Sequence, residues 1–130
     1  MIKTHSLILR KDDYELMMRY LRSGQGRNRY DQENAIHFEK ELQKADIVEK
    51  EDFPADTIRL NSLVRIMEMP GGKVRELTLV IPEHANVREG KISLLAPVGT
   101  ALIGFSKGQQ VDWQVPSGKK TFKILEVVNT

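Results

Sequence analysis

The sequence has no cysteine, few aromatic residues and no long apolar run. Without cysteine there is no disulfide framework, thiolate zinc site or thiol nucleophile, so we expect a cytoplasmic protein. No segment approaches the roughly 18 consecutive apolar residues of a transmembrane helix, and the apolar run near the N-terminus is too short for a signal peptide. We therefore expect no membrane association. Aromatic residues make up 6% of the chain, too few for a surface on which single nucleic-acid strands stack.

The length and charge of the chain set further bounds. At 130 residues it can bury one hydrophobic core, or one core with an appendage. Charged residues make up 29% of the sequence and the net charge is +2. So balanced a charge does not predict direct nucleic-acid binding.

A helical period runs through residues 11–46 and predicts a short helical hairpin. Asp12 is the expected N-cap of the first helix, with Glu15 three positions on, and Gly24 is expected to end it. The second helix is expected from about Asp31, its N-cap, to Ala45. Its predicted buried face repeats at three- and four-residue steps, at Ala35, Phe38, Leu42 and Ala45.

From Thr57 onward the pattern becomes strand-like. Pro70–Lys73 predicts a tight turn between two strands. Residues 97–104 are too apolar for a surface loop and predict a short helix packed on the sheet, and Trp113 is expected in the sheet core. The fold class is therefore α+β, with a helical hairpin over residues 1–53 and an antiparallel sheet domain over 54–130. The expected strands are five, at residues 57–66, 74–81, 91–95, 110–115 and 121–128.

Most catalytic constellations are missing from the sequence. His5, His37 and His84 lie far apart, with no metal-binding spacing, so each is expected at the surface. Gly99 and Gly104 have the spacing of a phosphate-binding loop, but Phe105-Ser106 replaces its Lys-Ser/Thr. We therefore expect these glycines to serve turns and helix packing, and we expect no metal and no cofactor.

Two carboxylates near the hairpin tip are the remaining catalytic candidates. Asp31 and Glu33 could together hold a divalent metal. Residues two apart on a helix, however, point about 200° away from each other. The N-cap role explains Asp31 without chemistry.

A longer string in the second half of the chain resembles a known family. Leu60–Ile66, Leu79–Pro82 and Gly90–Gly104 are similar to the C-terminal domain of the bacterial Gre transcript-cleavage factors, most specifically in Ile-Ser followed by Ala-Pro-Val-Gly-x-Ala-Leu-Ile-Gly. The likeness covers about half of the chain. Within the superfamily, Asn61-Ser62 and Val115–Gly118 resemble more closely the regulator of nucleoside diphosphate kinase.

This resemblance implies both a fold and a partner. It implies a sheet like that of the FK506-binding proteins, with a short helix, that docks on RNA polymerase at the rim of the secondary channel. The helical hairpin, a short coiled coil, then points into the channel. Nucleic acid is contacted only indirectly, through the transcription complex, and no small-molecule substrate is implied. The expected polymerase-binding residues flank or form the short helix: Ser93, Pro97, Gly99, Thr100 and Ser106.

The sequence departs from the Gre pattern at two places. Gre factors carry Asp-x-x-Glu at the coiled-coil tip to help hold a catalytic magnesium, whereas this chain has Asp31-Gln32-Glu33-Asn34. The family's Gly-Asp after the short helix is Gly108-Gln109 here. We therefore expect a regulator and not an enzyme, with a hairpin tip that carries Arg22, Arg27 and Arg29.

Two alternatives remain open at this point. One is a true transcript-cleavage factor that uses Asp31 and Glu33 in spite of their spacing. The other is a peptidyl-prolyl isomerase, because the implied fold is shared with such enzymes, although fold alone does not carry function.

Overall fold

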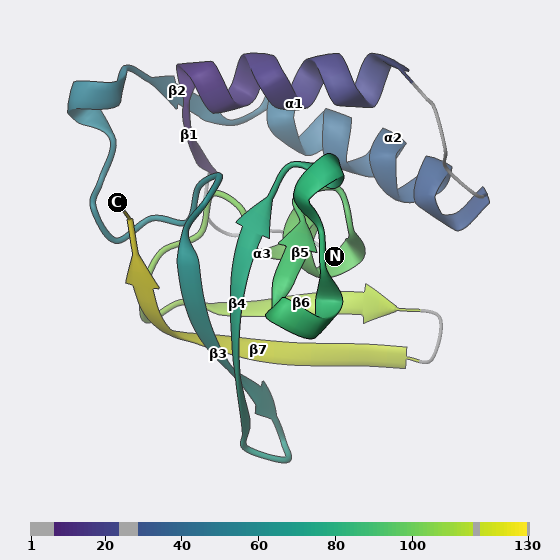
Figure 1. The fold of residues 1–130 in the computed structure, drawn as a ribbon, viewed down its shortest axis with the longest axis vertical. Coiled ribbons are helices and arrows are strands. Elements are labelled where there is room, and N and C mark those ends of the chain that lie inside the picture. Colours follow the sequence, from purple (N-terminus) through teal and green to yellow (C-terminus); the bar gives the residue numbers. More distant parts are fainter. Residues whose placement is uncertain (1–6, 24–28, 116–117, 130) are drawn as a thin grey trace. The chain divides into compact units, whose positions relative to one another are not determined.

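The computed structural model describes residues 7–23, 29–115 and 118–129. These residues form two compact units that divide after Phe53. The first contains the helices α1 and α2, and the second contains the main sheet (Figure 1). Among the described residues, no helix is long and apolar enough to cross a membrane.

The first unit is built from two short strands and two helices. β1 (Ile8–Arg10) leads directly into α1 (Lys11–Ser23), and α2 (Arg29–Gln43) is followed by β2 (Asp46–Val48) and the short 3₁₀ helix η1 (Lys50–Asp52). β1 and β2 pair in parallel. We did not predict these strands, because three residues are too few to show an alternating pattern.

The buried faces of the two helices follow the predicted period. On α1 the expected face is Met17, Tyr20 and Leu21, of which Met17 and Leu21 are buried and Tyr20 is half-buried, while Met18 is buried in addition. On α2, Phe38 and Leu42 are buried, and the two helices contact each other. The predicted face also included Ala35, whose side chain lies outside the described part of the structure, and Ala45, which follows the end of α2 and is half-buried.

Both predicted N-caps are wrong. α1 begins at Lys11, so Asp12 lies in its first turn, where its carboxylate accepts hydrogen bonds from Arg10. α2 begins at Arg29, so Asp31 is also inside its helix. Gly24, the predicted end of the first helix, lies outside the described residues.

The second unit contains the predicted five-stranded sheet and the short helix, so the mixed α+β architecture is confirmed. The strand order is β5-β4-β3-β7-β6. Helix α3 contacts β5 and β6, and the hairpin of β3 and β4 extends beyond β7 in Figure 1. The elements are β3 (Leu63–Met69), β4 (Lys73–Val80), β5 (Lys91–Ser93), α3 (Pro97–Leu102), β6 (Gln110–Val115) and β7 (Gly118–Val128).

The prediction of a fully antiparallel sheet is wrong at one edge, where β4 and β5 pair in parallel. The chain between them forms two 3₁₀ helices, η2 (Pro82–His84) and η3 (Val87–Glu89). This connection carries the chain back beside Thr78, so β5 pairs with the last three residues of β4 and runs in the same direction.

The first strand of the sheet is shorter than predicted. The sequence pattern predicts a start at Thr57, but β3 begins at Leu63. Asn61 has a left-handed backbone, with φ 71°, and the Ser62 N–H donates to the Arg59 carbonyl at 3.1 Å. The chain therefore turns just before the strand begins.

The core of the second unit lies on the face of the sheet that α3 covers. Val64 and Ile66 on β3, and Phe122 and Ile124 on β7, are fully buried, as is Leu102 on α3. Removing these side chains from water is the main favourable contribution to the stability of the sheet. The predicted core position of Trp113 falls on a side chain that the structure does not describe.

Candidate functional site

Helix α3 is held tightly against the end of β5. Its first residue is Pro97, whose fixed φ suits a helix start, and the Thr100 hydroxyl donates to the Pro97 carbonyl at 3.0 Å. A Cβ added at Gly99 lies 2.4 Å from the Ser93 carbonyl oxygen and 2.9 Å from the Leu94 Cα. Only glycine therefore lets the helix approach β5 this closely, which confirms the predicted packing role of Gly99.

The five predicted docking residues fall into two groups. Ser93, Pro97 and Ser106 are partly exposed, at the two ends of the α3 segment. Gly99 and Thr100 are buried. The partly exposed residues are accessible to a partner. The two buried residues instead hold α3 in place between them.

The loop after α3 is anchored at every amide from Phe105 to Gln109. The Lys107 N–H donates to the Asp56 carbonyl at 3.0 Å, and the Gly108 N–H donates to the Ile124 carbonyl at 2.8 Å. The Ser106 N–H donates to the side-chain oxygen of Gln109 at 2.6 Å. The remaining amides, Phe105 and Gln109, donate to the carbonyls of Leu102 and Ser106. Lys107 and Gly108 are nevertheless exposed, so this loop is both accessible and fixed.

A short segment before the sheet, residues 55–58, carries much of this anchoring, and we call it the strap. The Ile58 N–H donates to the Phe105 carbonyl at 2.8 Å, and the Gly104 N–H donates to the Ile58 carbonyl at 3.0 Å. The Thr57 and Ser106 hydroxyls lie 2.8 Å apart and share a hydrogen bond. The strap thus runs antiparallel beside the loop.

Asn129, which follows β7, holds the strap from the other side. Its side-chain nitrogen donates to the carbonyls of Ala55, at 2.9 Å, and Thr57, at 2.8 Å. Its side-chain oxygen accepts from the hydroxyl of Ser62, which is fully buried and also accepts from the Arg59 N–H. Sequence reasoning missed this network, because hydroxyl and amide side chains are ordinarily surface residues and carry no periodic signal.

The predicted tip residues lie in the first unit. Arg22 is exposed in the last turn of α1. Arg29, Asp31 and Glu33 belong to the first turns of α2, but their side chains lie outside what the structure describes. Arg27 falls outside the described residues altogether.

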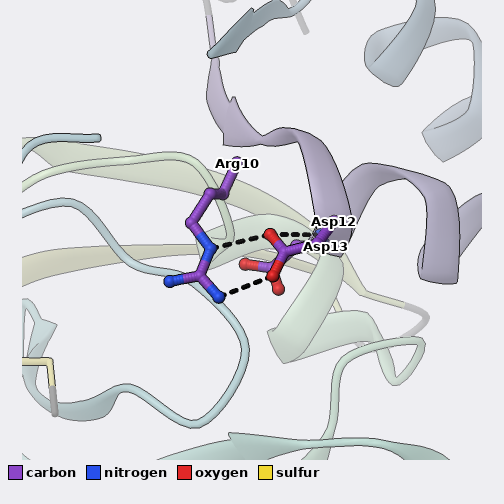
Figure 2. A network of polar contacts seen from close by, with 3 residues as sticks. All are labelled: Arg10, Asp12 and Asp13. Atoms are coloured by element: carbon purple, nitrogen blue, oxygen red, sulfur yellow. Dashed lines mark hydrogen bonds and ion pairs between the residues drawn. The ribbon is translucent and has the colours of Figure 1, made fainter. Parts of the chain in front are cut away.

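At the start of α1, Arg10 and Asp12 form a two-pronged ion pair (Figure 2). The Arg10 Nε and Nη2 atoms donate to the two carboxylate oxygens of Asp12 at 2.7 and 2.6 Å. The same carboxylate accepts the N–H of Asp13, at 3.0 Å. The bond to Asp12 raises the pKa of Arg10 above its ordinary value. Since an arginine is charged at any physiological pH, the pair fixes the β1–α1 junction and supplies no proton transfer.

The histidines and acidic residues show no metal geometry in the described ranges. His37 is exposed and faces Glu41 at 3.7 Å, and His84 is exposed on η2. His5 lies outside the described residues. Across residues 7–23, 29–115 and 118–129 there is no group of three or more His, Asp or Glu side chains that could hold a metal ion.

Comparisons with known proteins converge on one family. The family model for the C-terminal domain of the transcription elongation factors GreA and GreB matches residues 53–129. The regulator of nucleoside diphosphate kinase of Escherichia coli (strain K12) is 35% identical over 88 residues, which are 67% of this chain and 65% of that protein. GreA of Syntrophomonas wolfei subsp. wolfei is 36% identical over 92 residues, which are 71% of this chain and 58% of that protein.

The solved structure of a GreA/GreB transcription elongation factor from Nitrosomonas europaea superposes with a TM-score of 0.77 at 29% identity, over 97% of this chain and 100% of that one. The sequence matches to the curated relatives are shorter and span less than two thirds of those proteins' lengths. The family match nevertheless contains the whole sheet unit, with α3, the loop after it and the strap. The chain therefore belongs to the GreA/GreB family of transcription elongation factors.

Proposed function

We propose that this protein binds RNA polymerase in the cytoplasm and regulates transcription elongation from the rim of the secondary channel, without catalytic chemistry or a cofactor of its own. The observation that carries the proposal is the family match, because it covers the complete sheet unit, residues 53–129. Binding by this unit requires no catalytic group. Nucleic acid is then reached only through the transcription complex.

The docking surface in this proposal is formed by the ends of the α3 segment. Ser93, Pro97 and Ser106 are partly exposed there, and the buried Gly99 and Thr100 keep α3 seated on β5. A contact surface whose backbone is already ordered loses little conformational entropy on binding.

The helical unit is the part proposed to enter the channel. α1 has 13 residues and α2 has 15. At 1.5 Å per residue they are about 20 and 22 Å long. Such short helices suit partial occupancy of a channel and exclusion of longer coiled-coil factors. Arg22, Arg27 and Arg29 are proposed to face the acidic surroundings of the polymerase catalytic centre or the RNA end.

The positions of the two tip acids argue against transcript cleavage. Asp31 and Glu33 lie in one helix, two residues apart, and that spacing corresponds to about 200° around the axis of an ideal α-helix. The Gre pattern implied by the resemblance has its acids three residues apart, on one side of the helix. We therefore propose that cleavage is not stimulated strongly.

Binding is tested with purified core RNA polymerase and the tagged protein in a pull-down. We expect capture of polymerase and displacement by an excess of GreA. The variant Pro97→Arg places a long charged side chain on the proposed surface and is expected to weaken capture. Val87→Arg makes the same change at a residue that is 79% exposed on η3, and it is the matched control. If the wild-type protein captures no polymerase, the proposal is contradicted.

Cleavage is tested with stalled elongation complexes that carry end-labelled RNA. We expect the RNA to stay intact when the protein is added, while GreA shortens it. Shortening by this protein that is lost in Asp31→Ala supports the cleavage alternative instead.

A further inference from the structure

The loop Gly104–Gln109 and the end of β7 are far apart in the chain, yet one hydrogen-bond network joins them. We propose that Asn129 is a positioning residue for the loop Gly104–Gln109 and that it acts through the strap. The inference rests on the proposed function, because Ser106 belongs to the proposed polymerase surface. The network itself is observed independently of that function.

The first step is the contact between Asn129 and the strap. The side-chain nitrogen bridges the carbonyls of Ala55 and Thr57, two residues apart. A single side chain that satisfies two carbonyls of one segment fixes the local path of that segment. The Ser62 hydroxyl, buried and donating to the side-chain oxygen of Asn129, fixes the orientation of the amide.

The second step is the contact between the strap and the loop. Three backbone bonds and one hydroxyl pair join them, with donor–acceptor distances from 2.8 to 3.0 Å. Thr57 takes part in both steps, since its carbonyl accepts from Asn129 and its hydroxyl bonds to Ser106. Thr57 is fully buried, so water does not readily replace either bond.

The third step is the effect of these hydrogen bonds on the order of the loop. Loops are ordinarily more mobile than the elements they connect. Here Lys107 and Gly108 are exposed, yet every backbone amide of the loop is hydrogen-bonded. The Lys107 amide donates directly to the carbonyl of Asp56 in the strap. Removal of Asn129 should therefore loosen the loop without removing any side chain from the docking surface.

Hydrogen exchange of the free protein tests the positioning role. In Asn129→Ala we expect the amides of Ile58, Gly104 and Lys107 to exchange about tenfold faster than in the wild type. The Thr78 amide, which donates to the Gly90 carbonyl at 2.8 Å elsewhere in the sheet, is expected to keep its rate. A second variant, Thr57→Val, is nearly isosteric and removes only the hydroxyl link, so we expect it to affect mainly Ser106 and Lys107.

Polymerase affinity tests the functional consequence. We expect Asn129→Ala to raise the Kd for core polymerase about fivefold or more. Leu77→Ala, in the buried face of β4, serves as a control that loses stability without touching the network, and its Kd should stay near the wild-type value.

The two measurements separate the possible failures. Unchanged exchange at Gly104 and Lys107 in Asn129→Ala overturns the positioning role, whatever the affinity. An equal loss of affinity in Leu77→Ala and Asn129→Ala also overturns it, because general destabilisation then explains the effect. If the wild-type protein does not bind polymerase, the proposed function fails, and faster exchange in Asn129→Ala still supports the positioning of the loop.

Discussion

Gly99 packs so closely on Ser93 that a Cβ at position 99 would lie 2.4 Å from the Ser93 carbonyl oxygen. The neighbour is backbone, which cannot rotate away as a flexible side chain would. We expect Gly99→Ala to lower the free energy of unfolding by about 1–3 kcal/mol, because α3 must move off β5. Urea denaturation of the purified variant measures this.

Gly71→Ala is the matched control for that variant. Gly71 lies in the turn between β3 and β4, and a Cβ added there has no neighbouring atom within 4 Å. Its unfolding free energy is expected to stay within about 0.5 kcal/mol of the wild type. Equal stability of the two variants would show that α3 does not depend on the close approach.

Two apolar residues of α2 differ sharply in burial and therefore in expected effect. Phe38 is 2% exposed and Ile36 is 59% exposed. We expect Phe38→Ala to cost about 3–5 kcal/mol of stability, because it leaves a cavity, and Ile36→Ala to change it by less than about 0.5 kcal/mol. Thermal and urea denaturation followed by circular dichroism distinguish these outcomes. A large loss in Ile36→Ala would contradict the exposed position of that side chain.

Asp112 on β6 is expected to titrate below the usual range. The hydroxyl of Thr121, directly opposite on β7, donates to its carboxylate at 2.8 Å, and Lys119 lies 3.4 Å away. The Thr121 bond, followed by the attraction of Lys119, lowers the pKa of Asp112 from its ordinary 3.8. Because the pKa of Asp112 is lower in the folded state, its charged carboxylate stabilises the fold at pH values above its unfolded-state pKa. This stabilisation is lost as the pH falls through the folded-state pKa.

Carboxyl-carbon NMR titration measures the effect directly. We expect Thr121→Val to raise the pKa of Asp112 toward its ordinary value, and Lys119→Met to raise it less. An Asp112 pKa that does not respond to Thr121→Val would rule out the hydroxyl as the main cause.

The tip arginines provide a functional prediction. We expect simultaneous charge reversal at Arg22, Arg27 and Arg29 to weaken polymerase binding and to flatten its dependence on salt, because fewer favourable charge contacts remain. Binding measured at several salt concentrations tests this. Reversal of Lys40 and Lys44, in α2 and directly after it, is the control for a general change of charge. An unchanged salt slope in the triple variant would remove the tip contact from the proposal.

The sheet unit could be predicted well because its signals are local. The turn at Pro70–Lys73 identifies where β3 ends and β4 begins, the predicted bounds of β6 are those observed, and the apolar run bounded by Pro97 and Gly104 identifies α3. The resemblance to Gre factors also depends on this stretch. Periodicity and turn residues are properties of neighbouring positions, so one sequence is enough to show them.

The features that escaped prediction depend on residues far apart in the chain. The parallel direction of β5 follows from the path of the chain through η2 and η3, which no residue pattern encodes. The pairing of β1 with β2, and the link from Asn129 to Thr57, join segments separated by 38 or more positions. The predicted helix starts differ from the observed ones by one or two residues, because several neighbouring polar residues are of a type that can cap a helix.

The parallel pairing of Ile8–Arg10 with Asp46–Val48 has an architectural consequence. It places the point where the chain enters the helical pair beside the point where it leaves. Whole helical turns can therefore be inserted or deleted between these two points while the pairing of β1 and β2 stays the same. The length of the two helices can thus change, in evolution or by design, without any change in the sheet unit.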